Sequence, residues 1–275
     1  MGRNREFLGF SPTKDVLIDN EDDPSLVLTL ARGLLVLNCF NASSQELSNK
    51  EIAQVTGLSR PTVSRVTYTL AKFGYLRYVS SGQRYCLGLS VLAMAHPMLS
   101  QMRVRQIARP LMQHMANEIG GVVSIGMQYG RTMIYVESCA SGASVNPVVA
   151  GIGSQIPMFR TAMGRAYLCG LGPELREQLF DGVLRQDEGS KKYYSENLKE
   201  ALEHYSKWGF CLASRSLVRD AQSVGVPLGL KLDDQYFAFN CGIPMHRLRE
   251  DRLVNEIGPR LLQLVRDIKV SVGVR

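Results

Sequence analysis

The sequence predicts an α+β protein in which an N-terminal winged helix-turn-helix is followed by a helical linker and a larger C-terminal domain with an antiparallel sheet. Two short helical segments meet at a glycine turn and precede a hairpin, which is the order of a winged helix-turn-helix. After residue 104, strands and helices follow in mixed order, as in α+β domains. We expect a tail at 1–24, the winged domain at 25–88, the linker at 89–103 and the C-terminal domain at 104–275.

The bulk composition fits a two-domain globular protein. The chain has 275 residues, of which 45% are apolar, and it has no apolar run of 18 or more residues. We therefore expect no membrane span and no secretory signal. The six cysteines and four histidines are scattered without the spacing of a zinc site. We expect reduced thiols, a cytoplasmic location, and no metal or cofactor.

The positive charge is concentrated in one third of the chain. Residues 26–110 hold ten basic and two acidic side chains, whereas residues 1–25 hold three basic and six acidic ones. Residues 111–275 are nearly balanced, with nineteen basic and seventeen acidic side chains. Such a block attracts phosphate backbones, although a solubilising surface would have the same charge.

The N-terminal half of the predicted motif begins with an apolar helix at 26–40. A second, short helix follows Ser48, which is a good N-cap, and Glu51 stands three residues later as in a capping box. Gly57 ends this helix at a position that favours a positive φ. The side chains expected to face the core are Ile52, Ala53 and Val55.

A third helix opens at Ser59, with Pro61 tolerated in its first turn. Its apolar stripe is expected at Val63, Val66, Leu70 and Phe73, and Gly74 ends it. Two extended runs at 75–79 and 84–87 surround Ser80-Ser81-Gly82 and predict a hairpin, the wing.

The start of the third helix has the side chains that a major groove accepts. In a helix-turn-helix, the first turns of the second motif helix enter the groove. Short hydroxyl side chains suit phosphates or base edges, and arginine can pair with guanine. The expected contacts are Ser59, Arg60, Thr62, Ser64 and Arg65, with Gln83 and Arg84 on the wing. An ordinary solvated helix face is the alternative, but the glycine turn, wing and charge together favour DNA.

The linker and the C-terminal domain are predicted from the same patterns. Helices are expected at 89–101, with a kink or break at Pro97, and at 104–119, 161–171, 173–180, 196–208 and 253–268. Strands are expected as two hairpins. One pairs 122–128 with 132–138, and the other pairs 223–231 with 236–241 around Asp233-Asp234.

The segment around Thr161 suggests an anion site. Pro157 disfavours helix before it, and Thr161 can cap the helix after it. The N–H groups of Ala162, Met163 and Gly164 would then point outward at the positive end of the helix dipole, where a carboxylate binds. Arg160 could add a charged donor. Simple helix capping beside a core is the alternative.

Five segments together resemble the IclR family of bacterial transcription regulators. They are LARGLLVLNCF, SNKEIAQVTGLSRPTVSRVTYTLAKFGYL, YCLGLSVLAMA, IPMFRTAMGRAYL and WGFCLASRSLVRDAQSVGVPLG. The resemblance covers about residues 30–266. It implies a GAF-like effector domain, a helical linker, and dimers or dimers of dimers on DNA. It also implies control of catabolic operons, often for aromatic or short organic acids.

The resemblance also implies effector contacts from the loop after Gly209 and from the two late strands. Matching by motif gives Ser214, Ser223, Asn240 and Gly242, with Cys241 between the last two. The family's loop is usually rich in acidic residues, but this one reads Cys-Leu-Ala-Ser-Arg-Ser. That departure suits a more anionic or more apolar effector.

The expected function is therefore a regulator that binds a double-stranded DNA operator and responds to a small organic acid. The alternative is a DNA-binding protein whose C-terminal domain only oligomerises. An enzyme is not expected, because G-x-S-x-G, H-E-x-x-H and Walker A motifs are missing. Gly151-Ile152-Gly153 also lacks the third glycine of a dinucleotide fingerprint.

Overall fold

The computed structural model describes residues 24–41, 44–142, 151–184, 191–213, 221–247 and 251–273. These residues form two compact units that divide the chain between Gln101 and Met102. Residues 1–23 of the expected tail, and the expected effector contact Ser214, lie outside the described residues. Within the described part of the chain, no helix combines the length and apolarity needed to cross a membrane.

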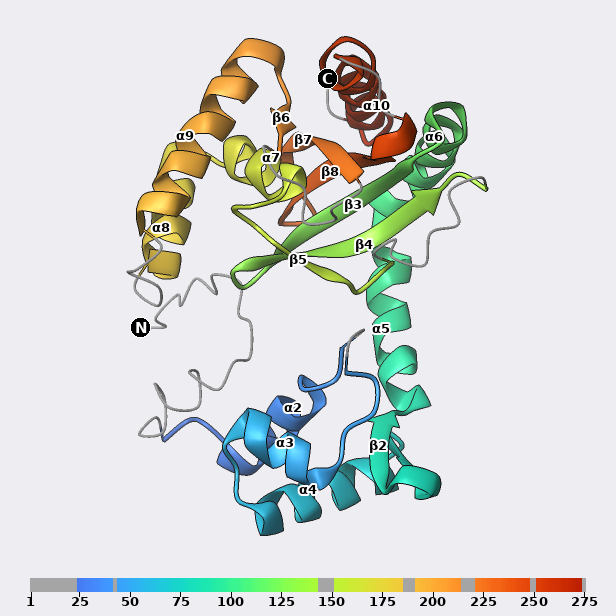
Figure 1. Ribbon diagram of the computed structural model, residues 1–275, viewed down its shortest axis with the longest axis vertical. Coiled ribbons are helices and arrows are strands. Elements are labelled where there is room, and N and C mark those ends of the chain that lie inside the picture. The colour runs from blue at the N-terminus through green and yellow to red at the C-terminus, as the bar shows by residue number, and fades with distance from the viewer. Residues whose placement is uncertain are drawn as a thin grey trace. The chain divides into compact units, whose positions relative to one another are not determined.

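The first unit is a winged helix-turn-helix. Its elements are α2 (Leu28–Leu37), α3 (Asn49–Thr56), α4 (Arg60–Lys72), β1 (Leu76–Val79), β2 (Arg84–Leu87) and α5 (Leu89–Gln101) (Figure 1). Ser48 caps α3 in a full capping box with Glu51, and Gly57 ends it at φ 73°. These local signals confirm the predicted helix limits. Strands β1 and β2 form the predicted hairpin, and α5 runs through Pro97 as one helix.

The core of this unit corrects two predicted positions. Val55 and Phe73, which were expected to face the core, are 61% and 71% exposed. On α3, the buried place is taken by Thr56, whose hydroxyl donates to the Ile52 carbonyl. Phe73 is already the C-cap of α4, so it lies beyond the last regular turn. The core cluster consists of Val36, Cys39, Phe40, Leu47, Ile52, Val63 and Leu76.

The second unit is built on a six-stranded, wholly antiparallel sheet in the order β5-β4-β3-β8-β7-β6. Its strands are β3 (Val122–Tyr129), β4 (Thr132–Ala140), β5 (Gln155–Pro157), β6 (Cys211–Leu212), β7 (Ala221–Leu232) and β8 (Gln235–Pro244). The sheet confirms the α+β prediction. Strands β5 and β6 were not predicted, because three and two residues are too short to show an alternating pattern.

Helices cover both faces of this sheet. Figure 1 shows α7 (Ala162–Gly170), α8 (Pro173–Leu184) and α9 (Lys191–Trp208) on one side. The other side is covered by α6 (Arg103–Ile119) and α10 (Gly258–Ser271), which continues a π-helical turn at Leu253–Ile257. On that second side, Glu137 is 1% exposed and pairs with Arg105 at 2.9 Å and Arg109 at 2.8 Å. These ion pairs attach α6 to β4.

Helix α7 approaches the sheet unusually closely, because glycines stand beneath it. A Cβ at Gly225 would lie 2.1 Å from the Ala162 carbonyl oxygen, and one at Gly126 would lie 2.3 Å from the Met163 sulfur. A Cβ at Gly164, on the helix itself, would lie 2.0 Å from the Met158 carbonyl oxygen. Real Cβ atoms do not approach backbone atoms this closely, so Gly225 and Gly164 require glycine, whereas at Gly126 the Met163 side chain would have to move. We call the side of the sheet under α7 the α7 face.

Candidate functional site

The N-terminus of α4 is a fixed, polar helix start. Ser59 is its N-cap, and its hydroxyl accepts from the Thr62 N–H at 3.4 Å. The two hydroxyls also share a hydrogen bond at 2.8 Å. Both hydroxyls, which were predicted to contact DNA, are therefore already oriented by the cap, and one hydroxyl proton is left to donate to a phosphate.

The outward face of α4 contains the remaining predicted residues of this helix. Arg60, Ser64 and Arg65 are all exposed. The opposite side of the helix is held in the unit by Val63, which is fully buried, and by Thr67, whose hydroxyl donates to the Asn49 side-chain oxygen of α3 at 3.1 Å. A helix fixed on α3 in this way presents its polar side to solvent.

Sequence reasoning missed two members of this outward face. Tyr68 is 62% exposed, and the Lys72 ammonium lies 5.4 Å from the centre of its ring. Spacings of three and seven residues from Arg65 place both side chains on the same side of the helix. That spacing was visible in the sequence and could have identified them.

The two wing residues that were predicted to contact DNA lie in different surroundings. Gln83 is exposed at the tip, with φ 49°. Arg84 instead binds inside the unit, because it donates to the Glu46 carbonyl at 2.8 Å and pairs with the Glu51 carboxylate at 3.0 Å. Hydrogen bonds from Ser48, together with Arg84, lower the pKa of Glu51 to about 2. Arg84 therefore ties the wing to α3.

The N-terminus of α7 is more enclosed than the sequence suggested. Thr161 caps it, and its hydroxyl accepts from the Gly164 N–H at 3.2 Å. The cap therefore uses the Gly164 donor and leaves the N–H groups of Ala162 and Met163 as candidate anion donors. Both of these residues are fully buried, whereas Arg160 is exposed.

Polar side chains gather on the α7 face beside this helix start. Ser124 of β3 lies directly opposite Asn240 of β8 and opposite Ser138 of β4. The two serine hydroxyls share a hydrogen bond at 3.0 Å. Asn240 also stands opposite Gly225, the glycine against which Ala162 packs. Directly opposed residues share one side of an antiparallel sheet, so this group lies next to the N-terminus of α7.

Asn240 has an unused acceptor in this buried group. The residue is 9% exposed, and its Oδ1 atom has no hydrogen-bond partner among the described residues. Its amide donates to the phenolic oxygen of Tyr135, whose pKa burial raises to about 12. A buried acceptor without a partner costs free energy. The position therefore fits a ligand that brings a donor.

The strand register separates the other predicted effector residues. Ser223 and Gly242 oppose each other on β7 and β8, in phase with Asn240. Cys241 points to the opposite face, because neighbouring residues of a strand alternate. Burial raises the pKa of its thiol to about 12. Cys241 therefore does not join the polar group on the α7 face.

Arg165 is a buried cation that sequence reasoning did not select. It is 2% exposed and donates to the Leu212 carbonyl at 2.9 Å and to the Asn197 side-chain oxygen. It also pairs with Glu200 at 3.0 Å. Arg165 thus joins α7 to α9 and β6. No local sequence pattern marks Arg165, since its partners come from elements more than thirty residues away.

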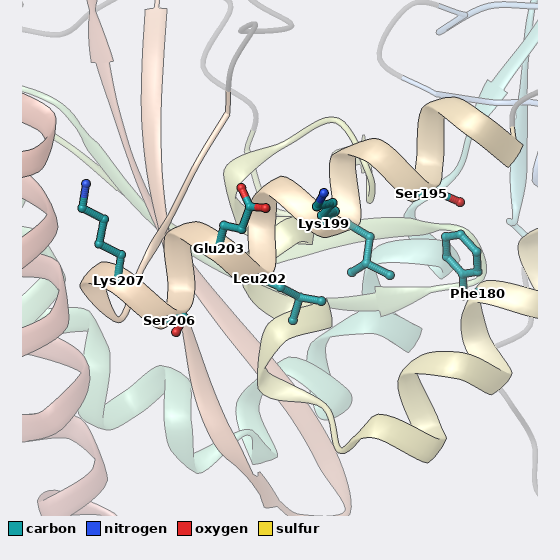
Figure 2. Close-up of a pocket in the computed structure, with 8 residues that line it drawn as sticks. Phe180, Ser195, Lys199, Leu202, Glu203, Ser206 and Lys207 are labelled. Atoms are coloured by element: carbon teal, nitrogen blue, oxygen red, sulfur yellow. The ribbon is translucent and has the colours of Figure 1, made fainter.

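A groove runs along the outer side of α9. Figure 2 shows its lining residues, and its volume is about 690 Å³. They are Phe180 of α8 and, from α9, Ser195, Leu198, Lys199, Leu202, Glu203, Ser206 and Lys207. The polar members of this lining are exposed, as on an ordinary solvated helix face. The groove lacks the buried polar groups found on the α7 face, and it is not our candidate site. Nor do three metal-ligating side chains cluster anywhere in the described ranges.

Models of one protein family match both halves of the chain. Residues 29–80 match the model of the IclR helix-turn-helix domain, and residues 96–270 match that of the bacterial transcriptional regulator IclR C-terminal domain. The HTH-type transcriptional regulator TsaQ1/TsaQ2 from Comamonas testosteroni is 29% identical over 254 residues, which cover 92% of this chain and 91% of that protein.

Solved structures agree with these matches. An IclR family transcriptional regulator from Brucella abortus is 34% identical, with a TM-score of 0.79 over 90% of this chain and 94% of its own. An IclR homologue from Microbacterium hydrocarbonoxydans, complexed with 4-hydroxybenzoate, has the same fold. It is 18% identical, with a TM-score of 0.64, and the match covers 87% of this chain and 99% of its own.

Proposed function

The chain belongs to the IclR family of bacterial transcription regulators, and we propose on that basis that a small hydroxylated carboxylic acid controls its binding to operator DNA. The family and its relatives are regulators, so the chain is a DNA-binding protein and not an enzyme. The observation that supports the ligand is the unpartnered, buried Oδ1 atom of Asn240 beside the N-terminus of α7.

The proposed DNA contact is the outward face of α4. Ser59 and Thr62 orient the helix start toward phosphates, and Arg65 lies in the middle of the exposed side. An arginine that pairs with a guanine is worth about 1–3 kcal/mol of base discrimination. Tyr68 and Lys72 extend the same side. Gln83 at the wing tip also belongs to the proposed DNA contact, whereas Arg84 does not, because it pairs with Glu51.

The proposed DNA-bound unit is at least a dimer of identical chains. One winged helix reads only a few base pairs, and two-fold proteins match half-sites spaced by helical turns. The first unit has large apolar side chains at its surface that a second copy could cover. They lie on two helices and the residue before α2: Val27, Leu30 and Leu34 at α2, and Leu89, Leu92, Met94 and Met98 on α5.

The proposed ligand needs two kinds of group. Because the amide of Asn240 already donates to Tyr135, its free Oδ1 atom must accept a hydrogen bond, and a ligand hydroxyl supplies one. The N–H groups of Ala162 and Met163, at the positive end of the α7 dipole, suit a carboxylate. Both sets of atoms border Gly225, so one small molecule can meet them together.

Hydroxybenzoates are the first compounds to test. A hydroxylated aromatic acid carries a donor at one end and a carboxylate at the other, and a protein of the same fold is complexed with 4-hydroxybenzoate. The proposal does not rely on Arg160, which is exposed, or on Cys241, which points to the other face. Binding would favour one arrangement of the sensor unit and so shift DNA affinity.

The test is a calorimetric titration of the full-length protein with 4-hydroxybenzoate and with benzoate, which lacks the hydroxyl. A hydrogen bond to a buried acceptor is worth about 1–3 kcal/mol, so we expect a preference of roughly 5- to 150-fold for the hydroxylated acid. Asn240→Ala should abolish that preference. Cys241→Ala, which alters the opposite face at the next position, should keep it.

Two results would count against the proposal. Equal affinity of the wild type for both acids would mean that Asn240 does not contact the hydroxyl. Failure of any hydroxybenzoate to bind, in a protein that still binds DNA and oligomerises, would favour a C-terminal domain that only oligomerises.

A further inference from the structure

Two cysteine side chains meet in the core of the second unit. Cys169 of α7 and Cys211 of β6 are 42 residues apart, and the Cys211 thiol donates to the Cys169 sulfur at an S···S distance of 3.7 Å. The same Cys211 thiol also lies within hydrogen-bond distance of the Ala201 carbonyl, at 3.5 Å, whereas the buried thiol of Cys139 has only a backbone carbonyl, that of Arg109, as its acceptor. The Cys169–Cys211 contact is therefore a dithiol whose sulfurs need only a short movement to bond.

The surroundings of the pair give its two sulfurs different roles. The hydrogen bond from Cys211 lowers the pKa of Cys169, and the positive charges of Arg176 and Arg165 lower it further, against the effect of burial. Arg176 is fixed there by its bond to the Leu168 carbonyl at 3.5 Å. Cys169 also keeps 8% of its surface exposed, whereas Cys211 has none. Cys169 thus has the features of a nucleophilic thiolate, and Cys211 those of its proton-donating neighbour.

We propose that Cys169 and Cys211 form a reversible disulfide when the protein meets a small hydroperoxide. In the first step, the Cys169 thiolate attacks the O–O bond of hydrogen peroxide and becomes a sulfenic acid, with hydroxide as the leaving group. In the second step, the Cys211 sulfur attacks the sulfenic sulfur, its proton passes to the departing oxygen, and water leaves. In total, two thiols and one peroxide give one disulfide and two waters.

The disulfide would join two elements that are now held by weaker contacts. Strand β6 has only two residues and pairs with β7 at the edge of the sheet. It is attached to α7 through the Arg165 bond to the Leu212 carbonyl. A covalent link at Cys211 would fix this edge strand to α7. This proposal is independent of the nature of the effector.

The test is peptide mapping of the reduced full-length protein after treatment with hydrogen peroxide. Free thiols are alkylated under denaturing conditions, and the peptides are analysed without reduction. We expect a linked peptide pair containing Cys169 and Cys211, which dithiothreitol separates. Cys139→Ala should form the same link. Cys211→Ala should instead accumulate a sulfenic acid at Cys169 that dimedone traps, because the second thiol is missing.

The map of the wild-type protein decides the question even if a variant fails to fold. Alkylation of both Cys169 and Cys211 after peroxide treatment would overturn the proposal. So would a disulfide that joins either of them to another cysteine. In Cys211→Ala, dimedone labelling confined to Cys86, which is partly exposed on the wing, would equally show that Cys169 does not react.

Discussion

Replacing Gly164 by alanine tests the close packing of α7 on its preceding loop. In a helix interior, alanine is ordinarily favoured over glycine by about 1 kcal/mol. At this site, however, the new Cβ would lie 2.0 Å from the Met158 carbonyl oxygen and 2.5 Å from its carbonyl carbon. Overpacking costs about 1–3 kcal/mol, and this case falls at the upper end, because backbone atoms cannot rotate away. The clash therefore exceeds the propensity gain, and we expect a net loss of about 2 kcal/mol.

The assay is thermal unfolding followed by tryptophan fluorescence. Trp208, at the end of α9, is the single tryptophan of the chain and reports on the second unit. A loss of about 2 kcal/mol should lower the midpoint by about 4–8 °C in a domain of this size. Gly182→Ala is the matched control, since Gly182 lies in α8 with nothing within 4 Å of its built Cβ. It should raise the midpoint. If Gly164→Ala raised it as well, the described approach of α7 to Met158 would be refuted.

Three further substitutions test the DNA contact of α4, the cap of α3 and the buried carboxylate of Glu137. Arg65→Ala should weaken operator binding by roughly 5- to 150-fold in a gel-shift titration with the fold intact, and unchanged affinity would remove Arg65 from the interface. Glu51, with a pKa of about 2 against an ordinary 4.5, stabilises the first unit above pH 4.5 and loses this effect as the pH falls through 2. Glu51→Gln should lack that pH-dependent part of the stability in circular-dichroism melts, and a wild-type slope in the variant would exclude Glu51 as its cause. Glu137→Gln should cost about 3 kcal/mol in the Trp208 assay, because it removes a carboxylate that is 1% exposed and with which both Arg105 and Arg109 pair. Glu118→Gln, at a half-exposed pair, should cost under about 1 kcal/mol, and equal losses would contradict the argument.

Local signals in the sequence were sufficient for most of the first unit. Ser48, Glu51 and Gly57 act on the backbone within one helical turn, and the structure has the capping box and left-handed C-cap that they predict. Val55 and Phe73 failed because an apolar side chain near a helix end is buried only if another element covers it. That covering depends on tertiary contacts, which periodicity alone does not contain.

The candidate site also depends on tertiary contacts that the sequence pattern does not contain. Thr161 was correctly predicted as the cap of α7, but the loss of the Gly164 donor to that cap appears only in the hydrogen-bond geometry. The sequence could not separate Asn240 from Cys241, because both lie in a run that is buried on both faces of the sheet. Arg165 required knowledge of its Asn197 partner on another helix. Long-range partners thus decide which polar residues become buried.

The most direct test of the account is the response of operator binding to the acid. Fluorescence anisotropy would measure the affinity of the full-length protein for an operator selected in vitro, with and without 4-hydroxybenzoate. Coupling between two sites is typically 1–3 kcal/mol, so the acid should change wild-type affinity by roughly 5- to 150-fold. Asn240→Ala should bind the operator as the wild type does without the acid, and it should respond to 4-hydroxybenzoate no more strongly than to benzoate at the same concentration. A variant that responds like the wild type, or a wild type that responds equally to benzoate, would contradict the account.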